Sequence, residues 1–378
     1  MNIFADLTEE IAVKTALEKH DDPETARIKR FLSLPDLSRQ ENSPIAALVK
    51  RIIALPDFAD FDLVTAPEIV SADISFNLFD FPANHPARSH SDTYYVDEKN
   101  ILRPHTTIMW YYHLGQDAVR QKIAAGQNTG ALCHGKVYRK DEIDRSHMNV
   151  FHQMDGWFLC PKNKKVITDN DLKQVLIKIA QAIFGSEMEY RFNPDLFPYT
   201  DPSLEMEVKV EDKWAEVLGA GVVKGKVLDN LSVDSTVYNG WAFGFGLERL
   251  AILSMSLPDI RLLWSQDERI KRQLQLGHKY QEVSKYPPIS RDISFVVSKD
   301  FVPNNYFDLI RDLGGNLVEE VSLIDTYEDK AKFGAGRLSY AYRIVYRSTE
   351  RTLTAEDVKT LQEKIEQETK RQFGAEIR

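Results

Sequence analysis

The final quarter of the chain alternates strand-like and helix-like segments in an order that few folds accommodate. Patterns typical of strands lie at residues 293–297, 318–327 and 338–346, and patterns typical of helices lie at 304–313 and 355–373. The first of these helices ends at Gly314-Gly315, and every even position of the strand at 338–346 is Leu, Tyr or Ile. This order predicts a ferredoxin-like β-α-β-β-α-β module.

The region before this module has a different pattern, in which strands alternate with long polar connections and few helices. Residues 150–158 and 214–219 are strand-like, whereas 171–184 and 247–256 have helical spacing. This mixture predicts an α+β fold with helices packed on a largely antiparallel sheet. Upstream, Ser43-Pro44 is typical of a helix start, and the residues up to about 40 predict one or two surface helices or a partly mobile extension.

Composition limits the classes of protein that the chain can belong to. Its 378 residues favour two or three domains, and no apolar run is long enough for a transmembrane helix, so we expect no membrane partner. Its two cysteines, Cys133 and Cys160, are too few for a disulfide framework or a cysteine-rich zinc site. A net charge of −9 argues against binding nucleic acid by bulk charge, although a local patch remains open.

The sharpest local motif is the segment GWAFGFGLERL at residues 240–250. Its glycines at 244 and 246 lie where a strand pattern gives way to a helix pattern, and glycine lets a ligand or another backbone approach closely. Arg249, one turn into the helix, would point back at such a ligand. The alternative is a tight packing turn that binds nothing.

A second motif, residues 138–156, predicts two strands joined by a charged loop. Arg139 and Arg145 would present planar donor forks to a phosphate or a carboxylate. His147 and His152 do not predict a metal site, because they lie on opposite faces of a strand and no third soft ligand is near. The alternative is a solvated run of charges.

Two further segments combine polar donors with aromatic residues. Residues 103–107 (RPHTT) precede three aromatics at 110–112, and Phe197 and Tyr199 flank a proline. Such residues can line an apolar pocket that carries a few polar groups. The alternative for each aromatic is ordinary core packing.

Taken in order, these segments resemble the class II aminoacyl-tRNA synthetases, and specifically the single-chain, mitochondrial-type phenylalanyl-tRNA synthetases. The resemblance runs from about residue 43 to the C-terminus. It rests on APEIVSADISFNLFDFPANHPARSHSDTYYV, NILRPHTT, VYRKDEIDRSHMNVFHQMDGW, LFPYTDPSLEMEV, WAEVLGAGVV, GWAFGFGLERLAIL, PDIRLLWSQDERI, SKYPPISRDISFVV and IVYRSTERTL.

The resemblance implies an antiparallel catalytic sheet of six or seven strands with flanking helices. Its domains would be an N-terminal helical extension (1–42), a catalytic domain (43–275), a linker (276–284) and a ferredoxin-like anticodon-binding domain (285–378). Because the two modules fill residues 43–378, we expect no editing domain. The single-chain relatives do not dimerise, so we also expect a monomer.

The implied reaction is that of a phenylalanine–tRNA ligase. L-Phenylalanine and ATP give phenylalanyl-adenylate and pyrophosphate, and the aminoacyl group then moves to the 2′-hydroxyl of the terminal adenosine of tRNA(Phe). The first step needs two anions held together and charge absorbed as it develops, and no protein nucleophile. Mg²⁺ would enter with ATP, and Glu216 is the candidate ligand because Mg²⁺ favours one or two carboxylates plus phosphates.

The motif match also implies an ATP site. Arg139 would bridge the substrate carboxylate and the α-phosphate. Arg249 would lie by the γ-phosphate and stack on the adenine, with Phe151 on the other side of that ring. Asp141 would lie near the adenine amino group, and His147 would contact the β- or γ-phosphate.

For the amino acid, the match implies a polar end made of four residues. His105 and Thr107 would meet the α-amino and carboxylate groups, and Gln153 and Asp155 would lie beside the amino group. Two of them depart from the family pattern, since Thr107 replaces a usual serine and Asp155 shortens a usual glutamate. The shorter side chain would reach the amino group through water.

The aromatic end of that site is implied to be Phe197 and Tyr199, which would sandwich the substrate ring edge-to-face, with Ala242 as the floor. Tyr199 replaces a usual phenylalanine, and its hydroxyl needs a partner if it is buried. A phenylalanine site must reject tyrosine sterically, and Ala242 is where we expect that selection.

In the C-terminal module, Arg343 and Arg347 lie on the strand face opposite its tyrosines and would contact tRNA. Residues 283–378 hold 15 basic and 16 acidic residues, so the acidic excess lies mainly outside this module. The alternative for each arginine is a solvated stripe.

Two other classes of protein compete with the ligase: a binding paralogue that has kept the fold, and an RNA-binding protein without chemistry. The retained Arg139, Arg249 and Gln153 count against the first, and the net charge against the second. The N-terminus has neither the apolar core of a secretory signal nor the composition of a transit peptide, so we expect a cytoplasmic protein, with the mitochondrial matrix as the alternative.

Overall fold

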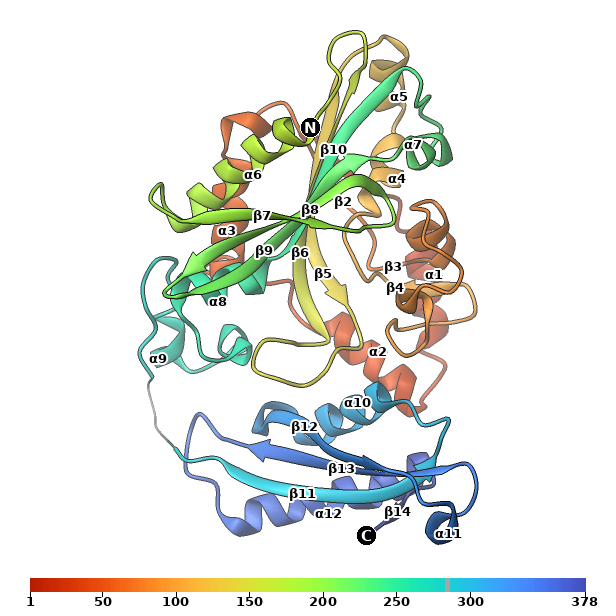
Figure 1. Ribbon diagram of the computed structural model, residues 1–378, viewed down its shortest axis with the longest axis vertical. Coiled ribbons are helices and arrows are strands. Elements are labelled where there is room, and N and C mark those ends of the chain that lie inside the picture. The colour runs from red at the N-terminus through yellow and green to blue at the C-terminus, as the bar shows by residue number, and fades with distance from the viewer. Residues whose placement is uncertain (283–285) are drawn as a thin grey trace. The chain divides into compact units, whose positions relative to one another are not determined.

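The computed structural model describes residues 1–282 and 286–378 (Figure 1). Contacts between residues divide the chain into two units. The first unit consists of Met1–Arg139, Val150–Leu257 and Leu274–Lys279, and the second of Lys140–Asn149, Pro258–Gln273 and Tyr280–Arg378. Residues 283 and 284, the end of the predicted linker, and residue 285, the predicted start of the last domain, lie outside the described residues.

The first unit is built on a large sheet, which has eight strands in the described residues. In spatial order these are β1 (Asn2–Phe4), β2 (Asp62–Thr65), β5 (Thr129–Tyr138), β6 (Val150–Pro161), β10 (Tyr238–Gly246), β9 (Lys213–Val223), β8 (Thr200–Val210) and β7 (Tyr190–Asp195). The pairs from β5 to β7 are antiparallel, as predicted, whereas β1–β2 and β2–β5 are parallel. The expectation of six or seven strands was therefore too low, because the N-terminal strand β1 joins the sheet.

The helices of the first unit are α1 (Thr8–Leu17), α2 (Pro23–Ser33), α3 (Pro44–Ile53), α4 (Met109–Leu114), α5 (Asp117–Ala124), α6 (Asp169–Phe184), α7 (Gly225–Asn230) and α8 (Leu247–Met255), and a small ribbon pairs β3 (Ile69–Ser71) with β4 (Asn100–Leu102). Three of these helices, α2, α3 and α6, begin at a residue whose side chain caps the helix. The Ser43 side chain accepts a hydrogen bond from the Ile45 N–H, which confirms the predicted start of α3. Residues 1–42 contain the strand β1 as well as the helices α1 and α2, and Ile28, Phe31 and Leu37 are buried, so this segment is part of the core.

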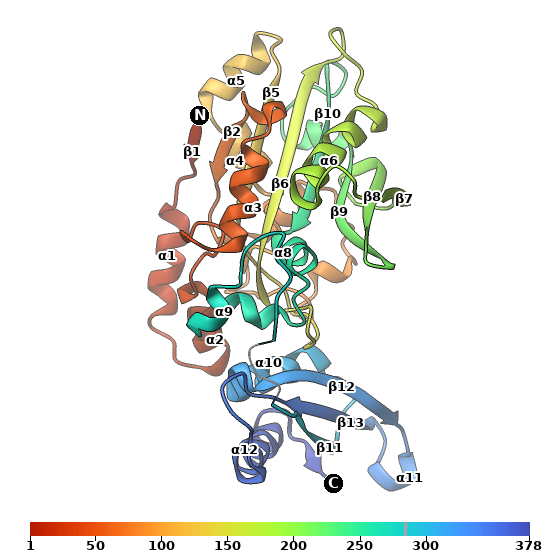
Figure 2. The same ribbon diagram turned by 90° about the vertical axis from the view of Figure 1, so that its left-hand side faces the viewer.

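One face of the sheet is aromatic. The rings of Trp241 and Phe243 stack at 5.8 Å, and Phe158 stacks on Trp241 at 5.7 Å. Figure 2 shows α3, α6 and α8 gathered on one side of this sheet, and α8 contacts β6 while α6 contacts β9 and β10. The helices cover these large aromatic rings, and the burial of their apolar area stabilises the first unit.

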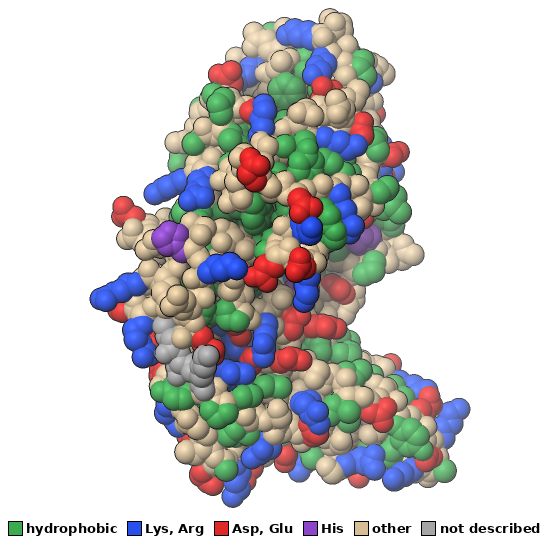
Figure 3. All heavy atoms as spheres, turned by 60° about the vertical axis from the view of Figure 1, so that its left-hand side comes forward, with side chains coloured by type: hydrophobic (Ala, Val, Ile, Leu, Met, Phe, Trp, Pro, Cys, Tyr) green, Lys and Arg blue, Asp and Glu red, His purple; other side chains and the backbone are tan. Residues whose placement is uncertain are grey.

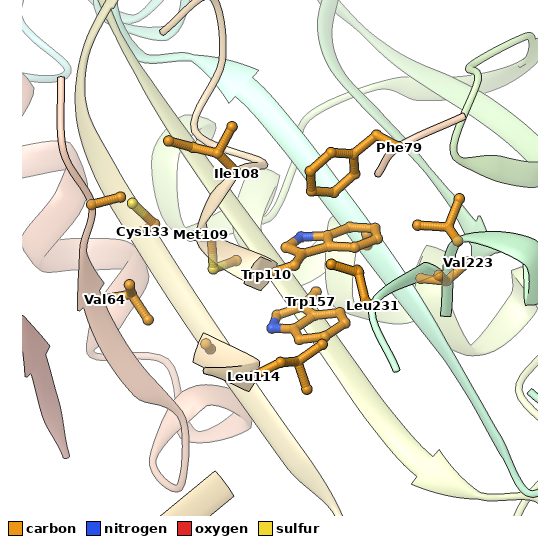
Figure 4. Close-up of a cluster of buried hydrophobic side chains, with 14 of the residues drawn as sticks. Val64, Phe79, Ile108, Met109, Trp110, Leu114, Cys133, Trp157, Val223 and Leu231 are labelled. Atoms are coloured by element: carbon orange, nitrogen blue, oxygen red, sulfur yellow. The ribbon is translucent and has the colours of Figure 1, made fainter. Parts of the chain in front are cut away.

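A second cluster of buried side chains surrounds two stacked tryptophans (Figure 4). The Trp110 and Trp157 rings lie 4.8 Å apart with an interplanar angle of 9°. The Trp157 Nε1–H donates to His113 Nδ1 (3.2 Å), and the other ring nitrogen of His113 then donates to Asp62 (3.0 Å). Burial alone raises the pKa of Asp62, but the bonds from His113 and the terminal ammonium and the neighbouring positive charges outweigh it and lower the pKa to about 2.

The second unit contains the predicted ferredoxin-like module. Its elements are β11 (Ile289–Ser298), α10 (Pro303–Gly314), β12 (Val318–Tyr327), the short α11 (Lys330–Phe333), β13 (Arg337–Tyr346), α12 (Ala355–Phe373) and β14 (Glu376–Ile377), with the sheet order β12-β13-β11-β14. The predicted tyrosine face of β13 is buried at Tyr342, Ile344 and Tyr346. The β-α-β-β-α-β prediction is thus confirmed, with α11 as an added turn.

The charged segment 140–149 belongs to this second unit by its contacts, although the predicted boundaries put it in the catalytic domain. Ile143 is buried in the core of the module, and its carbonyl accepts a hydrogen bond from the Val321 N–H (3.0 Å). Arg311 donates to the carbonyl of Asp141 (2.8 Å). Ile143, one of the two apolar residues of this segment, therefore anchors it to the module. Residues 258–273, which include the short helix α9 (Glu268–Lys271), also belong to the second unit.

The surface carries both signs of charge. On the face shown in Figure 3, Lys and Arg side chains are intermixed with Asp and Glu side chains. Within residues 1–282 and 286–378, no helix is both long and apolar enough to cross a membrane.

We predict that Asp62→Asn lowers the free energy of unfolding of the first unit by about 1–2 kcal/mol at neutral pH, because a charged acceptor is lost. The folded pKa of about 2 lies below the ordinary value of 3.8, so this stabilisation is complete above pH 3.8 and is lost as the pH falls through 2. Urea unfolding followed by tryptophan fluorescence between pH 7 and pH 2.5 tests this. An equal difference between the two proteins at every pH would contradict it.

Candidate active site

Alternate residues of β6 carry the centre of the candidate site. Phe151, Gln153 and Asp155 share one face of this strand because successive side chains of a strand point to opposite faces. The residues beside them are small. Gly135 and Gly246 flank Gln153, and Cys133 and Gly244 flank Asp155. The glycines Gly219 and Gly221 continue this row on β9. The small residues let other side chains approach this face closely, since Gly219 lies under Phe197 and Gly135 under Arg103, and of these glycines only Gly246 would place a Cβ in open space.

Asp155 is a buried carboxylate held by two hydroxyl groups. Thr106 donates to one of its oxygens (2.8 Å) and Thr107 to the other (2.5 Å). A Cβ added to Gly244 would lie 2.7 Å from Asp155 Oδ1, so this position has to be glycine for the carboxylate to fit. Burial raises the pKa of Asp155 to about 6, although both threonines and the charges of Arg139 and Arg103 act in the opposite direction.

Arg139 follows directly after β5 and links two parts of the site. Its Nε–H donates to the carbonyl of Pro104 (2.8 Å), and its guanidinium lies 5.4 Å from the centre of the Phe151 ring. Its charge also acts on Asp155 and His105. The structure therefore brings together, around one arginine, the residue assigned to adenine and the residues assigned to the amino acid.

His105 is a buried, neutral imidazole. Burial and the neighbouring charge of Arg139 lower its pKa to about 3. Neither ring nitrogen has a hydrogen-bond partner among the described residues, although the Ser75 backbone lies close to the ring. Gln153 Oε1 is also buried without a partner in the part of the chain that the structure describes. Such groups are costly to leave unpaired, so they mark where a ligand would supply partners.

The two predicted aromatic walls lie together. The rings of Phe197 and Tyr199 are nearly parallel (12°) with centroids 6.0 Å apart. A third ring between them would need about 7 Å, twice the optimal carbon–carbon separation. No third ring therefore fits parallel between the two, and the edge-to-face contacts of Phe197 and Tyr199 with a substrate ring stay a prediction. The Phe197 ring lies over Gly219, where an added Cβ would be 2.6 Å from its edge.

Tyr199 keeps its hydroxyl bonded. The hydroxyl interacts with Thr107, and burial raises its pKa. Because Thr107 already donates to Asp155, the Tyr199 hydroxyl is the donor to Thr107. Thr107 thus joins Tyr199 to Asp155, and its contact with the α-amino and carboxylate end of the amino acid stays a prediction. Ala242, the predicted floor, is buried on β10 beside Trp157.

Arg249 and Glu216 form an exposed pair, with Nη1 3.3 Å from the carboxylate and 3.5 Å from the carbonyl of Glu216. The described residues contain no group of three or more His, Cys, Asp or Glu side chains that could hold a metal ion. Glu216 therefore fits a Mg²⁺ site only as a single carboxylate that shares the ion with phosphate oxygens, and Arg249 must leave it first.

Four predicted residues belong to the second unit. Asp141 and His147 lie in segment 140–149, where His147 is exposed and pairs with Asp144 (2.7 Å). Arg343 pairs with Asp292 through two bonds of 2.8 Å, and Arg347 donates to Glu319 (2.7 Å). Both arginines of the predicted RNA-binding face are thus already engaged by carboxylates.

Sequence reasoning missed several members of the site. Phe79 packs edge-to-face on Tyr199 (6.2 Å), and Phe81 stacks on His105 (5.9 Å, 1°). Thr106 was seen only as part of a donor cluster. The sequence does carry one indication of these residues. Phenylalanines at 76, 79 and 81 lie within six residues, which is more aromatic side chains than an exposed loop usually has.

Comparison with known proteins adds independent findings. A model of the class II core domain of tRNA synthetases (type F) matches residues 31–274, and a model of the ferredoxin-fold anticodon binding domain matches residues 284–378. The phenylalanine–tRNA ligase of chloroplasts and mitochondria from Arabidopsis thaliana is 40% identical over 321 residues, which cover 82% of this chain and 71% of that protein. The mitochondrial phenylalanine–tRNA ligase from Mus musculus is 35% identical over 351 residues, which cover 82% and 74%.

The mitochondrial phenylalanine–tRNA ligase of Saccharomyces cerevisiae is 31% identical over 391 residues, which cover 82% of this chain and 81% of that protein. These matches extend over both units and agree with the family that the sequence motifs resemble. The chain belongs to the phenylalanine–tRNA ligases of the class II aminoacyl-tRNA synthetases.

Proposed function

We propose that this enzyme activates L-phenylalanine with ATP and transfers the phenylalanyl group to the 2′-hydroxyl of the terminal adenosine of tRNA(Phe). The observation that carries the proposal is the position of Arg139. Its guanidinium lies against Phe151, the proposed adenine platform, and it is anchored to Pro104, next to the polar end of the amino acid site. The ligase names of the relatives support the same substrates.

In the first step, a carboxylate oxygen of phenylalanine attacks the α-phosphorus of ATP, and the bond from phosphorus to the bridging oxygen breaks to release pyrophosphate. Both reactants are anions, so they repel each other until a cation lies between them. Arg139 supplies that cation and its fork of donors. Asp155 holds the α-ammonium group of the substrate, which fixes the attacking carboxylate in place.

ATP would lie between Phe151 and Arg249. For Arg249 to reach the adenine and the γ-phosphate, it must exchange its present partner, Glu216, for the nucleotide. Glu216 would then be free to share Mg²⁺ with phosphate oxygens. Mg²⁺ would supply charge neutralisation of the phosphates. We also propose that Asp141 and His147 contact ATP.

In the second step, the 2′-hydroxyl of the terminal adenosine attacks the carbonyl carbon of the adenylate, and AMP leaves. The second unit would bind the anticodon part of tRNA(Phe), as the name of its matching model suggests. Arg343 and Arg347 would contact RNA only after phosphates replace Asp292 and Glu319 as their partners. We propose a monomer, in keeping with the single-chain relatives.

The compartment differs from our first expectation. The relatives that match over most of this chain are mitochondrial or chloroplast enzymes, which supports the mitochondrial matrix and not the cytoplasm.

We predict that Arg139→Ala lowers phenylalanine-dependent ATP–pyrophosphate exchange by about 100-fold or more, because the transition state loses its bridging cation. Arg120→Ala, which removes an arginine of α5 that bonds the carbonyl of Leu114, is the control and should keep wild-type exchange. Equal activity of the two variants would contradict the role of Arg139. Absence of exchange in the wild type with any aromatic amino acid would refute the proposed function.

We predict that the Kd of phenylalanine, measured by calorimetry without ATP, rises about tenfold per pH unit below pH 6. Only the ionised form of Asp155 attracts the substrate ammonium, and its pKa of about 6 makes that form scarce as the pH falls. Asp155→Asn should bind phenylalanine weakly and equally between pH 5 and pH 7. A wild-type Kd that does not change over that range would contradict this assignment.

We predict that Ala242→Gly raises kcat/KM for tyrosine about tenfold or more, because one methyl group of steric exclusion is removed. The resulting Tyr-tRNA(Phe) should persist, since we propose no editing activity. Aminoacylation with radiolabelled tyrosine, followed by incubation of purified Tyr-tRNA(Phe) with wild-type enzyme, measures both. Release of tyrosine faster than spontaneous hydrolysis would show that the enzyme edits.

A further inference from the structure

A buried histidine–glutamate pair joins β6 to α8. The Nδ1 atom of His152 lies 2.6 Å from one carboxylate oxygen of Glu248, and the backbone N–H of His152 donates to the other oxygen (2.8 Å). His152 is fully buried and Glu248 is 2% exposed. The two carboxylate oxygens of Glu248 thus bond the backbone N–H and the ring of His152.

The other nitrogen of the ring fixes its protonation. The backbone N–H of Leu37 donates to His152 Nε2 (2.9 Å), so Nε2 is an acceptor and the ring proton lies on Nδ1, where it is donated to Glu248. His152 is therefore held from both sides, and Asp36 Oδ1 also lies 3.4 Å from its Nε2. One side is α8, and the other is the loop between α2 and α3.

That loop is itself anchored on the sheet. Ser38 donates to Asp36 (2.5 Å), and its oxygen lies 2.8 Å from Nδ1 of His134 on β5. Arg39 donates to the carbonyl of His134 (3.0 Å). Leu37 and Ser38 are buried, so the segment from Asp36 to Arg39 is packed against β5 and β6.

The pair is adjacent in sequence to two residues of the proposed ATP site. His152 follows Phe151, and Glu248 precedes Arg249. Strand alternation turns Phe151 to the side opposite His152, so Phe151 faces the site while His152 points away from it. Two hydrogen bonds between His152 and Glu248 therefore tie the backbone under Phe151 to the first turn of α8, which carries Arg249.

We propose that His152 and Glu248, backed by the segment Asp36–Arg39, are positioning residues that set the separation of Phe151 and Arg249 for the adenine ring. This inference rests on the proposed function, because it assigns ATP to those two side chains. It also gives a role in catalysis to a segment that sequence analysis placed in an N-terminal extension. A ring that stacks between two planar groups tolerates little error in their spacing.

The geometry makes a sharp demand on position 248. His152 offers two donors, the backbone N–H and Nδ1–H, and only a carboxylate provides two acceptors. Glutamine has one acceptor and would turn its NH₂ group toward a donor. If the ring changed tautomer to accommodate it, Nε2–H would face the N–H of Leu37. Glu248→Gln therefore cannot accept from both donors of His152, while it keeps the size of the side chain and leaves Asp36 Oδ1 3.4 Å from Nε2.

The test is ATP–pyrophosphate exchange by wild type and Glu248→Gln, with the KM of ATP and the KM of phenylalanine measured separately. We expect the KM of ATP to rise about tenfold or more and the KM of phenylalanine to stay within about twofold. Ser38→Ala, which loosens the backing segment without touching the pair, should shift the KM of ATP in the same direction by a smaller factor. If Glu248→Gln does not fold, the KM of ATP of Ser38→Ala tests the inference instead.

Asp62→Asn is the matched control, since Asp62 also bonds a buried histidine, His113, elsewhere in the same unit. It should lower thermal stability while the ratio of the two KM values stays as in the wild type. An unchanged KM of ATP in folded Glu248→Gln, or in Ser38→Ala if Glu248→Gln does not fold, would overturn the inference. An ATP shift of equal size in Asp62→Asn would also overturn it. If the proposed function were wrong, the wild type would show no ATP–pyrophosphate exchange. Measuring wild-type exchange in the same experiment therefore distinguishes that outcome from a failure of this inference.

Discussion

The candidate site depends on one buried carboxylate, that of Asp155. An ionised carboxylate in an apolar interior is strongly unfavourable unless donors and positive charges surround it. Here Thr106 and Thr107 supply the donors, Arg139 supplies charge, and Gly244 supplies the space. These residues come from β5, β10 and the segment before α4, so the carboxylate is stabilised only when the sheet is assembled and that segment lies against it.

The sheet can hold such a site because its two faces are built differently. Phe158, Trp241 and Phe243 fill the face under the helices, whereas the residues beside Gln153 and Asp155 on the opposite face are glycines and Cys133. A shift of one residue in strand pairing would exchange the faces. It would place large rings where the ligand must lie and Asp155 among the helices. The same register therefore determines both the stability and the chemistry of this unit.

Much of this architecture could be predicted from the sequence. The helix at 44–53, the strand–helix order of the C-terminal module and the buried face of β13 follow from periodicity and caps, which are local. The contact between Leu37 and His152 joins residues 115 positions apart, and no local pattern reports it. Glu248 gave a weak signal, since it is a charged residue at a position of α8 that periodicity assigns to the core.

The geometry of individual side chains was the hardest part to predict. Motif matching named Phe197, Tyr199 and Thr107 as site residues, but it could not show that the two rings stack on each other or that Thr107 has committed its proton to Asp155. Both depend on neighbours from other strands. Likewise, the sequence predicted a charged loop between two strands at 138–156, but it could not show that Ile143 of this loop packs in the core of the second unit.

The charge states of the site match an amino acid zwitterion. Arg139 is a cation and Asp155 is an anion near neutral pH, so in the proposed function Arg139 would attract a carboxylate and Asp155 an ammonium group. Burial keeps His105 neutral, with its pKa lowered to about 3. A protonated His105 would add a second positive charge beside Arg139 and would repel the substrate ammonium. Burial disfavours the charged form of both groups, so it lowers the pKa of His105 and raises the pKa of Asp155. Only Asp155 has enough hydrogen-bond donors to remain ionised.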